Sequence, residues 1–166
     1  MTSAWEQLWA PHRIEYIKGG TQPHAEDCPF CRIPEGDDVA GLVVHRGESA
    51  YVVMNLYPYN TGHVLVCPYR HFADYTEATD AETKEIAELT QKAMRVIRKV
   101  TGAHGFNIGM NQGAISGAGI ADHLHQHLVP RWSGDANFMP VIGGTKVMPQ
   151  LLGDSRAMLA EAWRDA

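Results

Sequence analysis

Three histidines stand at every second position of the stretch HLHQHLVP, at residues 123, 125 and 127. Side chains alternate between the two faces of a β-strand, so this spacing predicts a strand that carries all three imidazoles on one face. Imidazole is suited to metal ligation, proton transfer and nucleophilic attack near neutral pH. The spacing therefore predicts either a catalytic row of imidazoles or a metal site.

Two cysteines form a second candidate site. The motif CPFC places Cys28 and Cys31 in a polar segment that contains Gly and Pro, which we expect to form a loop or knuckle. Two imidazoles would complete the tetrahedral Cys₂His₂ set that zinc prefers, and the candidates are His71 and one of the three histidines. Four protein ligands leave no position for water, so such a zinc would be structural. A redox-active thiol pair is the alternative.

A glycine-rich loop, NQGAISGAGIAD at residues 111–122, leads directly into His123. Glycines let backbone N–H groups converge on an anion, and Asn111 and Gln112 can add side-chain donors. The loop matches neither the P-loop nor the dinucleotide-binding spacing, so a tight turn without a ligand is the alternative. Next to a row of imidazoles, however, the loop favours a phosphate site.

The combination of imidazoles with a phosphate site indicates a two-step transfer. A neutral imidazole can attack phosphorus and form an N-linked nucleotide, which water or another acceptor then removes. The middle ring, that of His125, is best placed to attack, because its neighbours can orient it from one side and donate hydrogen bonds to the phosphate or leaving group from the other.

The rest of the sequence predicts the elements that position these residues. Thr79 and Glu82 have the spacing of a capping box, and apolar residues then recur every three or four positions up to Gly102, which predicts a long helix. A second helical pattern lies within residues 146–163. Apolar, β-branched segments predict five strands, at 42–46, 50–55, 63–68, 105–111 and 123–130. Strands grouped on either side of one long helix predict an α+β fold.

Length, charge and cysteine content restrict the class of protein. The 166 residues, of which 45% are hydrophobic, suit one domain, and 14 basic against 19 acidic side chains argue against nucleic-acid binding. We expect a soluble, cytoplasmic protein with no membrane partner, because the sequence has neither a leader peptide nor a run approaching ~20 apolar residues. The odd count of three cysteines favours metal or redox chemistry over a disulfide framework.

The motifs together resemble those of the histidine triad (HIT) superfamily of nucleotidyl hydrolases and transferases. HLHQHLVP resembles its His-x-His-x-His-x-x signature, residues 55–71 resemble its nucleoside-binding strand-loop-strand, and CPFC resembles the zinc knuckle of its zinc-bearing members. The resemblance implies a five-stranded antiparallel sheet with flanking helices that pairs as a two-fold dimer. It also implies a single HIT domain over residues 1–166, with an N-terminal arm (1–20), a core (21–132) and a C-terminal extension (133–166).

The resemblance assigns roles to individual residues. It makes His125 the nucleophile that attacks the α-phosphate, while His127 binds the phosphate and helps the bridging oxygen to leave. Trp132 either stacks on a base or packs as a surface residue. The implied ligands of a structural zinc are Cys28, Cys31, His71 and His123. The implied nucleotide contacts are Asn55 at the ribose, His63 beside the phosphate site, and Asn111, Gln112, Gly117 and Gly119 at the phosphates.

The sequence around the triad resembles in particular the branch that acts on dinucleoside polyphosphates. The expected substrate is a dinucleoside polyphosphate or another adenine nucleotide, and the expected reaction is phosphorolysis or hydrolysis of diadenosine tetraphosphate through a nucleotidyl-histidine. Members of the phosphoramidase branch carry Gly-Gln-Ser before the triad; Ala118, Gly119 and Ile120 stand there instead, which argues against phosphoramidase activity. A non-catalytic, zinc-stabilised nucleotide-binding protein and a hydrolase with three histidine metal ligands are further alternatives.

Overall fold

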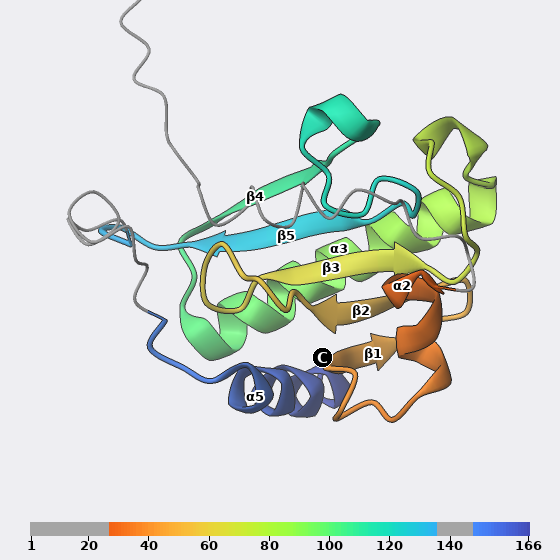
Figure 1. The fold of residues 1–166 in the computed structure, drawn as a ribbon. Coiled ribbons are helices and arrows are strands. Elements are labelled where there is room, and N and C mark those ends of the chain that lie inside the picture. The colour runs from red at the N-terminus through yellow and green to blue at the C-terminus, as the bar shows by residue number, and fades with distance from the viewer. Residues whose placement is uncertain (1–26, 136–147) are drawn as a thin grey trace, which may run out of the picture.

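The computed structural model describes residues 27–135 and 148–166. The N-terminal arm expected at residues 1–20 lies outside the described residues. The described chain forms one five-stranded sheet in the order β1-β2-β3-β5-β4, in which every neighbouring pair is antiparallel (Figure 1). The predicted α+β class and the five-stranded antiparallel sheet are therefore confirmed.

The strands correspond closely to the predicted segments. They are β1 Val43–Arg46, β2 Ala50–Met54, β3 Val64–Pro68, β4 Gly105–Met110 and β5 Gln126–Arg131. The helices are α2 Pro29–Arg32, α3 Asp80–Thr101 and α5 Leu152–Arg164, with the short 3₁₀ turns η2 Ile33–Glu35, η3 Tyr75–Glu77 and η4 Ala114–Ser116. None of the helices in the described part of the chain has the length and apolar character of a membrane-spanning segment.

The long helix α3 begins and ends where the sequence predicts. The Glu82 N–H donates to the Thr79 hydroxyl at 3.2 Å, and the Thr79 N–H donates to the Glu82 carboxylate at 2.8 Å, so the capping box is formed. Gly102 ends the helix in a left-handed conformation with φ 65°. A hydrogen bond from Arg70 lowers the pKa of Glu82 to about 2.

The two faces of the sheet have different partners. One face packs on α3 and α5, and in Figure 1 α3 passes behind the sheet while α5 lies beside β1. The opposite face carries a smaller cluster in which Tyr51, Leu65 and Cys67 contact Cys28 and Phe30 from the α2 region. The segment around α2 therefore covers part of the face that the long helix leaves open.

The histidine-bearing strand starts later than predicted. The sequence predicts a strand over 123–130, whereas β5 begins at Gln126, so His123 and His125 lie in an extended lead-in with a bend. The lead-in stays beside the sheet because the Leu124 N–H donates to the Phe72 carbonyl at 2.7 Å. The predicted alternation of side chains between the two faces is nevertheless confirmed, because Leu124 and Leu128 are buried in the helix-facing core. The three imidazoles thus share the other face.

CPFC is more regular than the predicted loop or knuckle. Cys28 is the N-cap residue of the one-turn helix α2, Pro29 is its first residue, and Cys31 lies within it. Proline suits this first position, since its fixed φ is helical and its missing N–H would have no partner there. The turn brings the two cysteines to the same side of the segment.

Candidate active site and metal site

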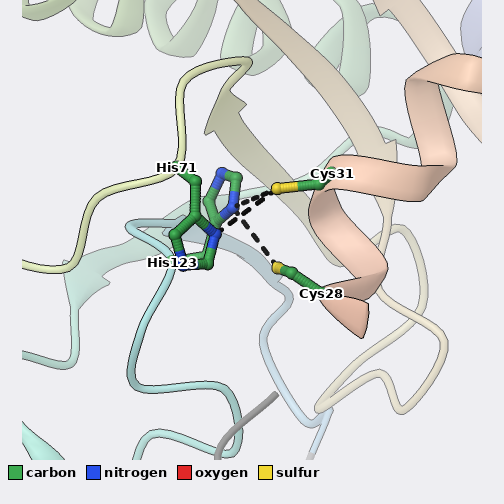
Figure 2. Close-up of side chains that lie close together, drawn as sticks. All are labelled: Cys28, Cys31, His71 and His123. Atoms are coloured by element: carbon green, nitrogen blue, oxygen red, sulfur yellow. Dashed lines mark hydrogen bonds between the residues drawn. The ribbon is translucent and has the colours of Figure 1, made fainter. Parts of the chain in front are cut away.

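Four side chains from three separate segments converge at the lead-in to β5: Cys28, Cys31, His71 and His123 (Figure 2). Their ligand atoms all lie within 4.8 Å of one another. His123 Nδ1 lies 3.4 Å from Cys28 Sγ and 3.5 Å from Cys31 Sγ. His71 Nδ1 lies 3.4 Å from Cys31 Sγ. The four residues proposed from the sequence as metal ligands therefore form one cluster.

The geometry of this cluster fits a tetrahedral metal ion. Zinc bonds of about 2.3 Å to sulfur and 2.0–2.1 Å to nitrogen separate sulfur and nitrogen ligands by about 3.5 Å in a tetrahedron. Those separations match the sulfur–nitrogen distances of the cluster. His123 Nε2 lies 2.9 Å from the Pro68 carbonyl and donates to it, which leaves the lone pair on Nδ1 directed at the thiols. Burial raises the pKa of the Cys31 thiol to about 11, so a metal ion would have to displace its proton.

His125 is held with one ring nitrogen committed to the backbone. Its Nδ1–H donates to the His123 carbonyl at 2.8 Å, so the neutral ring carries its lone pair on Nε2. The ring is buried and packs against Phe30, with ring centroids 4.8 Å apart. Burial lowers the pKa of His125, which favours the neutral form at pH 7. The ring therefore presents an unprotonated nitrogen, which is what a nucleophile requires.

His127 has the tautomer opposite to that of His125, because a chain of hydrogen bonds ends at its Nδ1. The Tyr59 N–H donates to His63 Nδ1 at 3.0 Å, so the neutral His63 ring has its proton on Nε2. That Nε2–H donates to His127 Nδ1 at 3.0 Å, which leaves the His127 proton on Nε2. The centroids of the His125 and His127 rings are 5.0 Å apart. A lone pair and an N–H donor thus stand side by side.

Two of the residues expected from the resemblance to contact the nucleotide, Asn55 and Asn111, can be placed relative to β5. Asn55 lies beside His63, with its amide nitrogen 3.3 Å from His63 Nδ1, and its side-chain oxygen accepts from the Tyr57 N–H at 3.0 Å. Met110 pairs with Gln126 in the β4–β5 ladder, so the next residue, Asn111, continues toward His125. Asn55 therefore lies on the β3 side of β5, beside His63, and the backbone reaches Asn111 on the β4 side.

The side chain of Gln112, which the resemblance places at the phosphates, also joins the glycine-rich loop to a neighbouring turn. Its side-chain oxygen accepts from the Tyr75 N–H at 2.8 Å, so this amide joins the loop to η3. Gly117 has a positive φ of 83°, which a residue with a side chain rarely adopts, and Gly119 is exposed. Backbone amides of the loop and Gln112 therefore stay predicted phosphate contacts, and Gln112 also links the loop to η3.

Trp132 does not lie with the histidines. Its indole N–H donates to the Thr101 carbonyl at 3.1 Å, and its ring packs against the core between the sheet and the helices. Of the two roles considered from the sequence, packing is the one that these contacts support.

Three residues at the site were not predicted: Tyr59, Asn60 and Asp135. The ring of Tyr59 stacks on His127, with centroids 5.5 Å apart and an interplanar angle of 12°. Asn60 is buried and its amide donates to the Asp135 carboxylate at 2.9 Å. Tyr59 and Asn60 lie in the 55–71 segment that resembles the nucleoside-binding strand-loop-strand, but within YNTG and SGD these three residues look like ordinary turn formers, and their partners lie far away along the chain.

The fold and the site together define a class of protein. Residues 38–134 match the HIT domain family, and the chain belongs to this family. Among its relatives is the AP-4-A phosphorylase of Mycobacterium tuberculosis, which is 49% identical over 164 residues that cover 95% of this chain and 84% of the relative. The asymmetrical bis(5′-nucleosyl)-tetraphosphatase of Schizosaccharomyces pombe is 32% identical over 64% of this chain and 56% of the relative.

Solved structures support the same fold. A Zn-bound histidine triad family protein from Mycobacterium smegmatis superposes with a TM-score of 0.67. It covers 86% of this chain and 96% of the other chain, at 24% sequence identity. At that identity the likeness establishes the fold alone.

Proposed function

We propose that this protein cleaves dinucleoside polyphosphates, with diadenosine tetraphosphate as the expected substrate, through a covalent nucleotidyl intermediate on His125. One observation carries the proposal: two adjacent imidazoles have opposite tautomers, with the lone pair of His125 Nε2 beside the N–H donor of His127. A transfer reaction at phosphorus needs such a pair, because a bond must form to a nucleophile while a leaving oxygen gains a proton or a hydrogen bond.

In the first step His125 Nε2 attacks the α-phosphorus. The new N–P bond replaces the P–O bond to the bridging oxygen, and ATP leaves from diadenosine tetraphosphate. The Nε2–H of His127 donates to the bridging oxygen as negative charge develops there. Backbone amides of the 111–122 loop, including those near Gly117 and Gly119, and the side chain of Asn111 would stabilise the non-bridging oxygens.

In the second step an oxygen of inorganic phosphate or of water attacks the same phosphorus. The N–P bond breaks, and the lone pair returns to His125 Nε2. Phosphate as acceptor gives ADP, and water gives AMP. The 49% identity to a phosphorylase supports phosphate as the acceptor. Asn55 is proposed to hold the ribose hydroxyls. Its amide nitrogen lies beside His63, which the resemblance places next to the phosphate site.

We also propose that Cys28, Cys31, His71 and His123 hold a structural zinc ion. Support comes from the converging donor atoms and from the Pro68 carbonyl, which fixes the tautomer of His123. When bound, zinc supplies a cross-link between α2, the segment after β3 and the lead-in to β5. With four protein ligands it leaves no site for a reacting water.

The test is turnover of diadenosine tetraphosphate with and without inorganic phosphate, with the mononucleotides identified by chromatography. With phosphate we expect ADP and ATP in equal amounts. AMP plus ATP in both conditions would contradict phosphorolysis and leave hydrolysis. Binding without any product, and without adenylylated protein, would favour the non-catalytic nucleotide-binding alternative over an enzyme.

A two-fold dimer is proposed as the assembly. β4 lies at one edge of the sheet, with no strand on its outer side among residues 27–135 and 148–166, and Ile108 on this strand is 48% exposed. Sedimentation equilibrium is expected to give twice the chain mass of 18.3 kDa. A single species at the chain mass at micromolar concentration would contradict it. The cytoplasmic location expected from the sequence stays a prediction.

A further inference from the structure

Asn60 is a buried amide whose hydrogen-bonding groups are all used. The residue is only 7% exposed, although it lies in a polar turn. The amide nitrogen donates to the Pro130 carbonyl at 3.0 Å and to the Asp135 carboxylate at 2.9 Å. Its side-chain oxygen accepts from the Thr61 N–H at 3.2 Å. Burying an amide is costly unless it is paired, so this set of bonds fixes the residue in one position.

Asp135 anchors that amide firmly. Its carboxylate accepts from Arg131 through two nitrogens, at 2.6 and 2.9 Å, and from the Trp132 N–H at 3.2 Å. The Asp135 side chain is only 10% exposed, whereas that of Arg131 is 48% exposed. The hydrogen bonds from Arg131 hold the pKa of Asp135 far below its usual range. Asp135 is therefore an acceptor at every working pH.

These contacts dock the 59–63 turn, meaning the residues from Tyr59 to His63, on the end of β5. The His63 N–H donates to the Asn60 carbonyl at 3.1 Å, which closes the turn. Gly62 has a positive φ of 73°, and a Cβ there would lie 3.5 Å from the Pro130 ring. Pro130 belongs to the same strand as His127, so the turn and that imidazole are held by one rigid element.

The docked turn supplies the first donor of the chain that ends at His127. The Tyr59 N–H points at His63 Nδ1, and His63 Nε2 points at His127 Nδ1, each at 3.0 Å. The Tyr59 ring also stacks on the His127 ring. The turn therefore sets both the tautomer and the plane of the imidazole that faces the leaving group.

We propose that Asn60 and Asp135 are positioning residues for the transfer reaction, which keep the proton of His127 on Nε2 by holding the 59–63 turn against β5. The inference rests on the proposed function, in which His127 donates to the bridging oxygen. If the turn moves away, His63 Nδ1 loses the Tyr59 N–H and keeps only the longer contact with the Asn55 amide nitrogen at 3.3 Å, so His63 can reverse its tautomer. His127 would then carry its proton on Nδ1 and present a lone pair, which cannot assist a leaving oxygen.

The test compares two adenylyl esters in an Asn60→Ala variant. The p-nitrophenyl ester of AMP has a good leaving group that needs little help, whereas the phenyl ester has a poor one. If His127 no longer presents its Nε2–H, kcat on the phenyl ester should fall by about 10- to 100-fold. On the p-nitrophenyl ester kcat should fall by less than about threefold, and KM should stay unchanged for both esters. Asp135→Asn should lower kcat on the phenyl ester less than Asn60→Ala does, because an amide oxygen can still accept from Asn60.

Asn107→Ala is the matched control. Asn107 accepts from Arg131 at 2.9 Å in the same corner of the fold but does not touch the 59–63 turn. Its kcat on both esters should stay at the wild-type value. Equal losses of kcat on the two esters in Asn60→Ala would overturn the proposal, since they would indicate general loosening of the site. Wild-type kcat in Asn60→Ala would overturn it too.

A spectroscopic measurement decides the proposal independently of turnover. In ¹⁵N-resolved NMR of the wild-type imidazoles, the protons of neutral His63 and His127 should both reside on Nε2. In Asn60→Ala, and to a smaller extent in Asp135→Asn, signals of the Nδ1–H form should appear at His127. A wild-type His127 protonated on Nδ1, or unchanged tautomers in folded Asn60→Ala, would refute the inference even if the wild type cleaved neither ester.

Discussion

Replacing His125 with alanine is expected to lower kcat for diadenosine tetraphosphate by a factor on the order of 10⁴ or more, since the variant has no group to accept the nucleotidyl moiety. The lost side chain is the ring whose Nδ1–H is bound to the His123 carbonyl and whose Nε2 faces the site. Nucleotide binding and metal content should persist, because no ligand of the metal cluster is removed. Rapid-quench kinetics, with mass spectrometry of the quenched protein, would measure turnover and the covalent adduct together.

His104→Ala is the control for this substitution. His104 is an exposed histidine outside the cluster, and its ring accepts from the Ser133 N–H at 3.0 Å. It should keep wild-type turnover and form the adenylyl adduct. If His125→Ala also retained turnover, or if the adduct were found on another histidine, the assignment of the nucleophile would be wrong.

Loss of the metal is expected to have the largest effect on stability. Cys31→Ala removes a thiol that faces His71 and His123, and should abolish stoichiometric zinc binding and lower the free energy of unfolding by about 4–5 kcal/mol. The reason is that three segments far apart in the sequence lose their common cross-link. Elemental analysis and urea unfolding of the purified variant would measure both quantities, and prolonged chelation of the wild type should reproduce the loss of stability.

Cys67→Ala is the control that separates the stability lost with the metal from the stability lost when any buried thiol is removed. Cys67 is fully buried in the cluster that contains Cys28 and Phe30, but it is not one of the four converging donors. It should lose some packing energy while keeping one zinc per chain. Full zinc content in Cys31→Ala, or an active, equally stable wild type after complete zinc removal, would contradict a structural zinc site. Activity abolished by chelation in a protein that stays folded would favour the metal-dependent hydrolase.

Local patterns allowed much of the fold to be predicted. Helix α3 could be bounded to the residue because the capping pair Thr79 and Glu82 and the terminating Gly102 are all local signals. The period of two correctly predicted that the imidazoles share a face. It could not locate the start of β5, because the pairing of the lead-in depends on Phe72, about fifty residues earlier. The helix α2 has four residues, which is too short for a periodic pattern.

The site residues also divide into those that the sequence could predict and those that it could not. The metal ligands and the three imidazoles belong to motifs with recognisable spacing, so a sequence is enough to name them. The docked turn is different: Asn60 and Asp135 are 75 positions apart, and each looks like an ordinary turn residue. Only the folded chain shows that the Asn60 amide donates to the Asp135 carboxylate, and that the same turn carries the Tyr59 N–H that donates to His63.

The segment from His123 to His127 gives three different tasks to one stretch of backbone. The first imidazole belongs to the metal cluster, the second presents a lone pair, and the third presents a proton. Between them, Leu124 enters the helix-facing core and Gln126 donates to Thr90 of α3. An insertion or deletion of a single residue in this stretch would turn the following imidazoles into the core and bring apolar side chains to the site. Divergence here is therefore restricted to exchanges of one residue for another, and the length of this stretch cannot change without separating the imidazoles before the change from those after it.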